Sequence, residues 1–307
     1  EFEDAVDEAL NISRRAELPG QLSHLAPRPY ASSGTFDRVF EKIDCAREHE
    51  GLIVGIDTFP DIWGPGMAVA LLPPWVYEGE REEVLQRLGS QETINKCRGH
   101  FSDPTNYLLR LGGLDMFYLS SSIAHPELAG KNLVEIGEAF GCDPVEAVFR
   151  LVLADGADFY NVMIRHVFAK SAELDRLLMN PYCSVESDGV VTATDGLLSN
   201  FTMNRSSFGY TIRFIEEYVL QRNIFSLEEA IRKMTSLPAD SAGLSNRGRI
   251  EVGKAADLVV LDLDKLADNS TDEVPQAYPS GVELVVVNGE VVLDQGHRLD
   301  ILPGGLA

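Results

Sequence analysis

The stretch LIVGIDTFP, residues 52–60, determines the fold class that the sequence predicts. Its first five residues are apolar or glycine, without polar alternation, which is typical of a strand buried on both faces of a sheet. Before it, Phe36, Val39 and Ile43 recur at the spacing of an amphipathic helix. The strand ends at Asp57, and the helix that leads into it indicates an α/β fold with a parallel sheet.

Strands and helices alternate on both sides of this stretch. Further strands are predicted at residues 21–25, 116–121, 161–168 and 183–189, and further helices at residues 3–15, 170–178, 210–221 and 226–235. Asp143, Pro144 and Glu146 predict another helix start, with the aspartate as its N-cap. Residues 61–80 are rich in proline and glycine and are predicted to form a loop. This order favours a parallel sheet with crossover helices.

The pattern changes from about residue 249 onward. A strand is predicted at residues 257–262, and a hairpin joins residues 282–287 to residues 290–293. Asn288 and Gly289 lie between the two hairpin strands and predict a tight turn. We therefore expect a small C-terminal β unit and place the domain boundary near residues 240–250.

Composition excludes some partners. The 307 residues include 26 Lys and Arg against 48 Asp and Glu, which gives a net charge of −22. Such a surface repels phosphate backbones and anionic lipid, so nucleic acid is not an expected partner. No apolar run approaches the ~20 residues of a membrane helix, so no membrane partner is expected either. The four cysteines are scattered and form no C-x-x-C pair, which indicates a reduced, cytoplasmic protein.

Several common catalytic motifs are absent from the sequence. There is no G-x-S-x-G, no H-E-x-x-H, no P-loop and no G-x-G-x-x-G after a strand. Serine esterase, zincin and nucleotide-binding interpretations therefore lack support.

Polar residues at predicted strand ends are the candidates for chemistry, because functional side chains of βα folds lie at the carboxyl ends of strands. This rule selects Ser23 and His24, Asp57 and Thr58, Ser120 to Ser122, Arg165 and His166, and Asp188. Imidazole and carboxylate groups can hold zinc, and a strand-end aspartate can deprotonate a metal-bound water. A lone histidine is more often a packing residue, and an aspartate before glycine is more often a turn residue. Spacing alone leaves both interpretations open.

The C-terminal third of the chain resembles a known family. KMTSLPA (residues 233–239), RGRI (residues 247–250) and GKAADLVV (residues 253–260) are similar to the C-terminal signature of the amidohydrolase superfamily. VVVNG (residues 285–289) is similar to its closing strand. The resemblance implies a partial (β/α) barrel over residues 1–245, with a helical insertion at about residues 100–160. Residues 246–307 would then belong to the β-sandwich of that superfamily.

Within this superfamily the chain resembles the N-acyl-D-amino-acid deacylases, through SHL (residues 23–25), DTFP (residues 57–60) and SDG (residues 187–189). The resemblance implies His24 as a zinc ligand, and Asp188 as both a zinc ligand and the catalytic proton carrier. It also implies that Arg205 pairs with the carboxylate of a small N-acyl amino acid. In the family mechanism zinc activates a water, and the aspartate passes the proton of that water to the departing amine.

The sequence departs from the family in ways that matter for this assignment. No His-x-His occurs in the chain, and Met203 and Asn204 replace the His-Pro that precedes the family's arginine. His24 and Asp188 alone do not provide the three protein ligands of a catalytic zinc. We expect the early barrel strands and the first part of the β-sandwich to lie upstream of Glu1, or an oligomeric partner to cover the open barrel.

Two alternatives remain open. The chain could be a non-catalytic homologue that has lost its metal site, serving as a binding or partner subunit. It could also be another amidohydrolase, one that acts on cyclic amides. The SDG and TSLPA stretches favour the deacylase over this last possibility.

Overall fold

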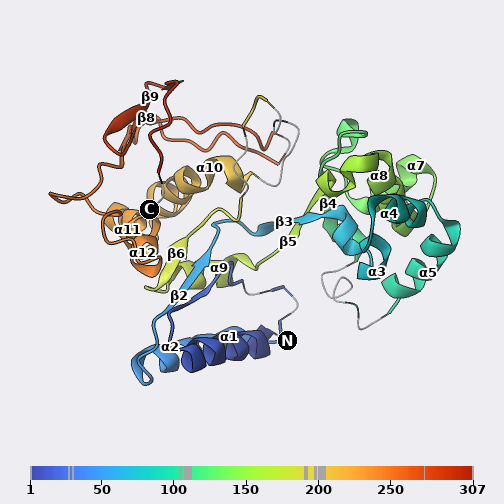
Figure 1. The fold of residues 1–307 in the computed structure, drawn as a ribbon, viewed down its shortest axis with the longest axis horizontal. Coiled ribbons are helices and arrows are strands. Elements are labelled where there is room, and N and C mark those ends of the chain that lie inside the picture. The colour runs from blue at the N-terminus through green and yellow to red at the C-terminus, as the bar shows by residue number, and fades with distance from the viewer. Residues whose placement is uncertain are drawn as a thin grey trace.

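The structure is a computed structural model that describes residues 2–26, 28–29, 31–103, 106, 113–189, 193–196, 199, 205–272 and 274–305. Figure 1 shows a helical lobe on the right of the view, joined by extended strands to a larger α/β part on the left. The larger part holds the parallel strands, and the chain ends in a separate β-sheet. At this level the α/β prediction with a C-terminal β unit is confirmed.

Three strands form the parallel sheet: β1 (Gly20–Leu22), β2 (Val54–Thr58) and β6 (Cys183–Val185), in the order β1-β2-β6. Every residue of β2 is buried, as the apolar run predicts for a central strand. Helices α1 (Phe2–Ala16), α2 (Thr35–Glu48) and α9 (Ser171–Met179) pack their apolar faces into the same core. In Figure 1, α1 and α2 lie below these strands, and α10 lies above them.

A second, antiparallel sheet has the order β3-β5-β4, with β3 at Trp63–Met67, β4 at Phe117–Ser121 and β5 at Met163–Val167. The strands predicted near residues 116–121 and 161–168 exist, but the prediction that they join the parallel sheet is wrong. Their partner β3 lies in the segment predicted to be a loop. Gly64 lets Phe168 approach, since a Cβ there would lie 2.8 Å from its ring. Pro65 is tolerated because β3 is an edge strand of this sheet.

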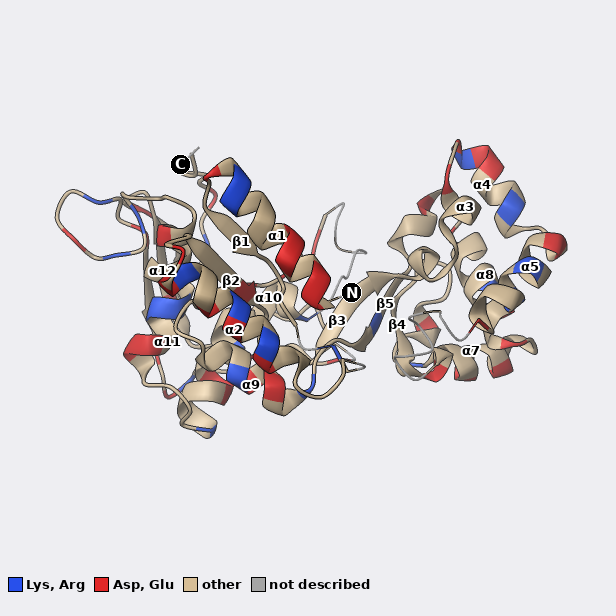
Figure 2. Ribbon diagram, turned by 90° about the horizontal axis from the view of Figure 1, so that it is seen from below, with Lys and Arg blue, Asp and Glu red and all other residues tan. Residues whose placement is uncertain are grey.

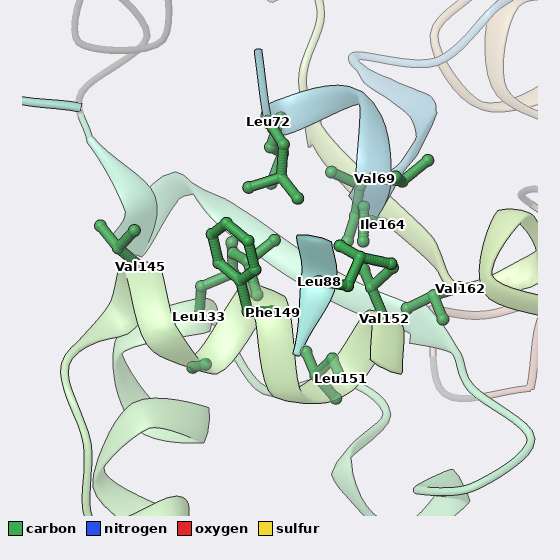
Figure 3. Packing of buried hydrophobic residues seen from close by; sticks show 14 of the residues in the cluster. Val69, Leu72, Leu88, Leu133, Val145, Phe149, Leu151, Val152, Val162 and Ile164 are labelled. Carbon is green, nitrogen blue, oxygen red and sulfur yellow. The ribbon is translucent and has the colours of Figure 1, made fainter. Parts of the chain in front are cut away.

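The helical lobe has its own hydrophobic core, which draws on residues 68–164. Figure 3 shows Phe149, Leu151 and Val152 packed among Leu88, Leu133 and other apolar side chains. The lobe contains α3 (Pro74–Tyr77), α4 (Arg81–Leu88), α5 (Gln91–Phe101), α7 (Leu133–Phe140), α8 (Pro144–Ala154), and the 3₁₀ turns η1 (Ala68–Leu71), η2 (Leu114–Met116), η3 (Pro126–Leu128) and η4 (Gly156–Asn161). The helix start predicted at Asp143 is confirmed, because its carboxylate accepts the backbone N–H groups of Val145 and Glu146.

The C-terminal part begins with helices and ends in strands. Helix α10 (Ser206–Arg213) runs into a π-helical segment, η5 (Phe214–Gln221), and α11 (Leu227–Met234) and α12 (Ser236–Ser241) follow. The last sheet has the order β10-β9-β8-β7, formed by β7 (Leu258–Leu261), β8 (Val282–Val287), β9 (Glu290–Asp294) and β10 (His297–Arg298). The hairpin prediction is confirmed, with Asn288 and Gly289 at positive φ between β8 and β9.

Figure 2 shows that both acidic and basic residues occur on the helices of the helical lobe and of the larger α/β part. In the described part of the chain, no helix combines the length and the apolar character needed to cross a membrane.

Candidate functional site

The carboxyl ends of the three parallel strands meet at one edge of the sheet. His24 follows β1, Asp57 lies near the end of β2, and Asp188 follows β6. The register pairs Ile56 with both Leu22 and Cys183, so the segments after β1 and β6 leave the sheet on either side of Asp57. Three candidates selected by the strand-end rule therefore lie at the same edge of the sheet.

Asp57 organises the segment after β1. Its buried carboxylate accepts hydrogen bonds from Gln21 Nε2 (2.5 Å), Ser23 Oγ (3.0 Å) and the backbone N–H of His24 (2.7 Å). The backbone N–H of Leu25 donates to the Asp57 carbonyl oxygen at 2.9 Å. Asp57 thus fixes the backbone of His24 and leaves the exposed imidazole available.

His24 and Asp188 share an unusual backbone conformation. Their φ angles are +40° and +44°, in the left-handed region that residues other than glycine rarely adopt. The Asp188 turn is closed by its backbone N–H, which donates to Glu186 Oε2, and by the N–H of Gly189, which donates to Ser187 Oγ at 3.1 Å. Such conformations persist where surrounding contacts hold them, and they cluster at active sites.

Two acids at this edge, Asp188 and Glu186, have raised pKa values. Burial raises the pKa of Asp188, and the nearby His24 opposes this effect. Burial also raises the pKa of Glu186 to about 7, and the charges of Asp57 and Asp188 add to the increase. The sequence analysis missed Glu186. Its position two residues before Asp188, at the end of a buried strand, was the available signal.

These residues do not form a complete metal site. Among the residues described here, no group of three or more His, Cys, Asp or Glu side chains is placed to hold a metal ion. His24 and Asp188 remain two candidate ligands at one sheet edge, and the residues present do not fit a zinc ion without additional donors.

Arg205 lies in a second polar cluster, which the Asp188 turn adjoins. Its Nε is 2.7 Å from Asp61 Oδ2 and 3.8 Å from Asp272 Oδ1. A Cβ on Gly189 would lie 2.8 Å from Ser207 Oγ, so the Asp188 turn abuts the start of α10. Met203 and Asn204 lie outside the described residues.

Buried ion pairs build the rest of this cluster. Arg213 Nη1 is 2.5 Å from Asp61 Oδ2, and Arg213 Nη2 is 2.6 Å from Asp268 Oδ2. The side chains of Asp61 and Asp268 are 3% and 5% exposed. Both carboxylates are therefore desolvated and depend on the arginines. Nothing in the local sequence around Arg213 or Asp268 signals this pairing.

Two of the remaining strand-end candidates, Ser122 and His166, lie away from this edge. Ser122 Oγ donates to Asp155 Oδ1 at 2.8 Å and closes a loop within the helical lobe. His166 stacks on Phe117 with ring centroids 5.4 Å apart. Burial, and then the charge of Arg28, lowers the pKa of His166 to about 4. His166 is therefore a neutral packing residue of the antiparallel sheet.

Comparisons with known proteins add independent information. A family model described as the amidohydrolase family matches residues 145–293. The N-acyl-D-glutamate deacylase of Alcaligenes xylosoxydans xylosoxydans is 31% identical over 299 residues, which cover 96% of this chain and 50% of that protein. The D-aminoacylase of the same organism is 25% identical over 289 residues, covering 94% and 48%. The chain spans about half the length of the curated relatives it matches.

Solved structures agree with these matches. The N-acyl-D-glutamate deacylase from Bordetella bronchiseptica, crystallised with zinc and a phosphonate inhibitor, has a TM-score of 0.70 at 26% identity, over 95% of this chain and 50% of that one. A crystal structure of D-aminoacylase has a TM-score of 0.69 at 23% identity, over 97% of this chain and 51% of that one. The latter likeness concerns the fold alone.

Proposed function

Because this chain belongs to the amidohydrolase family, we propose that it is part of a metal-dependent hydrolase that cleaves the amide bond of small N-acyl-D-amino acids. The observation that carries this proposal is the meeting of His24, Asp57 and Asp188 at the carboxyl edge of the parallel sheet. Support also comes from the 31% identity to an N-acyl-D-glutamate deacylase over 96% of the chain.

Asp188 is the proposed proton carrier. It takes a proton from the attacking water and returns it to the amine nitrogen that leaves. A carboxylate whose pKa is raised by burial suits this task better than an exposed one, because its proton affinity is closer to that needed near neutral pH. Asp57 acts as a positioning residue, since it holds the backbone of His24.

We further propose that His24 and Asp188 are two ligands of a zinc ion, with the remaining ligands contributed from outside the described residues. The Bordetella bronchiseptica relative was solved with zinc. Arg205 is the proposed partner of the substrate carboxylate. Support for Arg205 is its place at the start of α10, next to the Asp188 turn.

The architecture proposed for residues 1–245 is part of a (β/α) barrel, with residues 246–307 as a β-sandwich segment. Strands β1 and β6 each have one parallel neighbour among the described strands, whereas every strand of a closed barrel has two. The insertion proposed at about residues 100–160 would extend back to Ala68, because the core of the helical lobe begins there.

All four cysteines are free thiols, which supports our proposal that the protein works in the cytoplasm.

One observation favours a second candidate function, a non-catalytic binding subunit: no three-ligand cluster occurs among the described residues.

Zinc content and turnover test the proposal. Residues 1–307 alone should turn over little N-acetyl-D-glutamate or N-acetyl-D-alanine, because two ligands bind zinc weakly. Tight, stoichiometric zinc binding in elemental analysis, together with turnover by this chain, would contradict the incomplete site.

In an active parent enzyme, Asp188→Asn should abolish turnover without changing the circular dichroism spectrum, and the exposed control Asp264→Asn should leave turnover intact. Retained activity in Asp188→Asn would remove it from the mechanism. A parent protein with neither zinc nor turnover would support the binding subunit.

A further inference from the structure

A small cavity lies where the antiparallel sheet meets α10 and the segment after β7. Its lining includes Trp63 and Ser120 from the sheet, Arg205 from the start of α10, and Asp272. Arg165, in the middle of β5, also faces it. The cavity therefore combines two guanidinium groups and an aromatic ring with two carboxylates, those of Asp61 and Asp272.

Aromatic rings hold Arg165 in place. Its guanidinium carbon lies 5.0 Å from the ring centre of Trp63 and 5.4 Å from that of Tyr118, and the two rings meet edge to face at 5.5 Å. Both rings lie close enough for cation–π attraction, and the N–H edge of a guanidinium group can pair with an anion. That edge is paired with the carboxylate of Asp272.

Asp272 is the one carboxylate of this cluster that water reaches. Its side chain is 28% exposed, against 3% for Asp61 and 5% for Asp268. Asp61 is already bound by Arg213, and so is Asp268. Asp272 is thus the group that can be exchanged while the buried pairs stay intact.

Among the described residues, three arginines (Arg165, Arg205 and Arg213) pair with three aspartates (Asp61, Asp268 and Asp272). If Asp272 swings out, Arg165 loses the carboxylate with which it pairs, in a partly desolvated site where an anion is favoured. A ligand carboxylate would take the place of Asp272.

The backbone near Asp272 allows such an exchange. Thr271 N donates to Val274 O and Val274 N donates to Thr271 Oγ1, both at 3.0 Å, so hydrogen bonds between residues on either side of Asp272 hold the backbone there. The preceding backbone is anchored separately, since the buried Ser270 donates its hydroxyl to Asp268 Oδ1 at 2.6 Å. The Asp272 side chain can leave without loss of the anchor.

We propose that Asp272 is an internal competitor for the ligand carboxylate, and that Arg165 and Arg205 together form the carboxylate-binding site it occupies. The ligand class is the carboxylate of an N-acyl amino acid, and in this respect the inference rests on the proposed function. Arg165 becomes a specificity-determining residue, and Asp272 sets the apparent affinity.

Trp63 provides a direct optical test. The chain has two tryptophans, so Trp75→Phe leaves Trp63 as the single fluorophore, next to Arg165. In this background, the fluorescence of residues 1–307 is titrated with N-acetyl-D-alanine and with N-acetyl-D-alaninamide, which lacks the carboxylate. Asp272→Asn should tighten binding of the acid about tenfold, because the competing carboxylate is removed, and should not change binding of the amide.

Arginine variants and a charge control complete the test. Arg165→Gln should weaken binding of the acid about tenfold, the scale of one charge-assisted hydrogen bond. Arg165→Lys, which keeps the charge but not the flat bidentate group, should weaken it as well. If circular dichroism shows that Arg165→Gln is unfolded, the affinity of Arg165→Lys for the acid is the test of Arg165. Asp264→Asn removes an exposed carboxylate of the same segment and should leave the affinity unchanged.

The inference is overturned if Asp272→Asn leaves the affinity for the acid unchanged. It is overturned as well if Asp272→Asn tightens binding of the acid and of the amide equally. It is also overturned if Asp264→Asn matches Asp272→Asn, or if Arg165→Lys binds like the parent. Because binding is read without turnover, the two proposals can fail separately. Tighter acid binding in Asp272→Asn with an inactive parent enzyme refutes the deacylase alone. If the parent enzyme is active and Asp272→Asn does not change its affinity for substrate, only this inference is refuted.

Discussion

Lys233 is a fully buried ammonium group that ties α11 to the parallel sheet. Its Nζ donates to the carbonyl oxygens of Asn180 (2.7 Å) and Cys183 (3.1 Å), at the amino end of β6 and away from the strand-end site. Burial lowers the pKa of Lys233. Backbone carbonyls, with a third contact to Glu229 Oε1 at 3.7 Å, compensate the buried charge.

Removal of this ammonium group should destabilise the protein. Lys233→Met leaves two carbonyls without their donor and should lower the free energy of unfolding by about 3 kcal/mol in a urea titration. Lys254→Met, which removes a surface pair with Glu251, should change it by less than about 0.5 kcal/mol. Equal effects of the two substitutions would show that the buried contacts of Lys233 carry no particular stability.

His166 should make stability depend on pH. Its pKa is about 4 in the folded chain, against an ordinary value of 6.5, so the unfolded state binds more protons between these pH values. The free energy of unfolding should therefore fall as pH drops from 6.5 to 4, with a contribution from His166 of about 3 kcal/mol.

Substitution isolates this contribution. His166→Phe cannot take up a proton, so its stability should fall less steeply over the same pH range, while every other titrating group is unchanged. Urea titrations of both proteins at several pH values give the difference. Parallel curves would show that His166 is not held neutral by burial.

At the scale of elements, helix α10 depends on a close approach between two segments. A Cβ on Gly209 would lie 2.0 Å from Asp268 Oδ1, the carboxylate that pairs with Arg213. Only a residue without a side chain lets the segment after β7 reach this helix. Gly209 therefore couples α10 to the cluster around Arg205.

A pair of helical glycines tests this coupling. Gly209→Ala should lower the free energy of unfolding by about 2 kcal/mol, because it pushes Asp268 from Arg213 and leaves buried charges poorly paired. Gly99→Ala, in α5, meets no atom within 4 Å and should stabilise by up to about 1 kcal/mol through helix propensity. Thermal unfolding measures both. A Gly209→Ala protein as stable as Gly99→Ala would mean that the approach to Asp268 can relax at little cost.

Local signals explain which elements could be predicted. The helix start at Asp143 and the hairpin turn at Asn288 depend on neighbouring residues alone, and both predictions are confirmed. Strand β3 was missed because its glycines and proline serve close contacts and an edge position, which composition does not distinguish from a loop. Without β3, the antiparallel pairing of β4 and β5 could not be inferred.

The residues of the candidate site also divide into those that local sequence indicates and those that only tertiary contacts reveal. His24 and Asp188 could be selected because each follows a strand that does belong to the parallel sheet. Their roles stay predictions. Asp268 and Asp272 could not be selected, because their arginine partners lie 55 or more residues earlier in the chain and only tertiary packing brings them together.

At the scale of the whole molecule, two main hydrophobic cores are separate. One fills the helical lobe, and the other lies around the parallel sheet. Leu151 and Leu177 are both fully buried, one in each core. The lobe core and the sheet core should therefore open as distinct units.

Matched substitutions can demonstrate this separation. Leu151→Ala should cost about 3 kcal/mol and should speed amide hydrogen exchange within residues 68–164, with little change in β1, β2 and β6. Leu177→Ala should produce the reverse pattern. Exchange that increases across the whole chain in both variants would show that the two cores unfold as one.

The pairing of β2 with β6 has a consequence for how the chain folds. Ile56 and Cys183 are neighbours in the sheet, although the helical lobe and its antiparallel sheet lie between them in the sequence. Closing so long a loop is entropically costly and slow. The antiparallel pairing of Trp63 with Val167 brings the two ends of the inserted segment together. Early formation of the helical lobe would thus shorten the loop that must close before β2 can pair with β6. The folding rate of the lobe would then limit the rate at which His24, Asp57 and Asp188 come together, although none of these residues lies in the lobe.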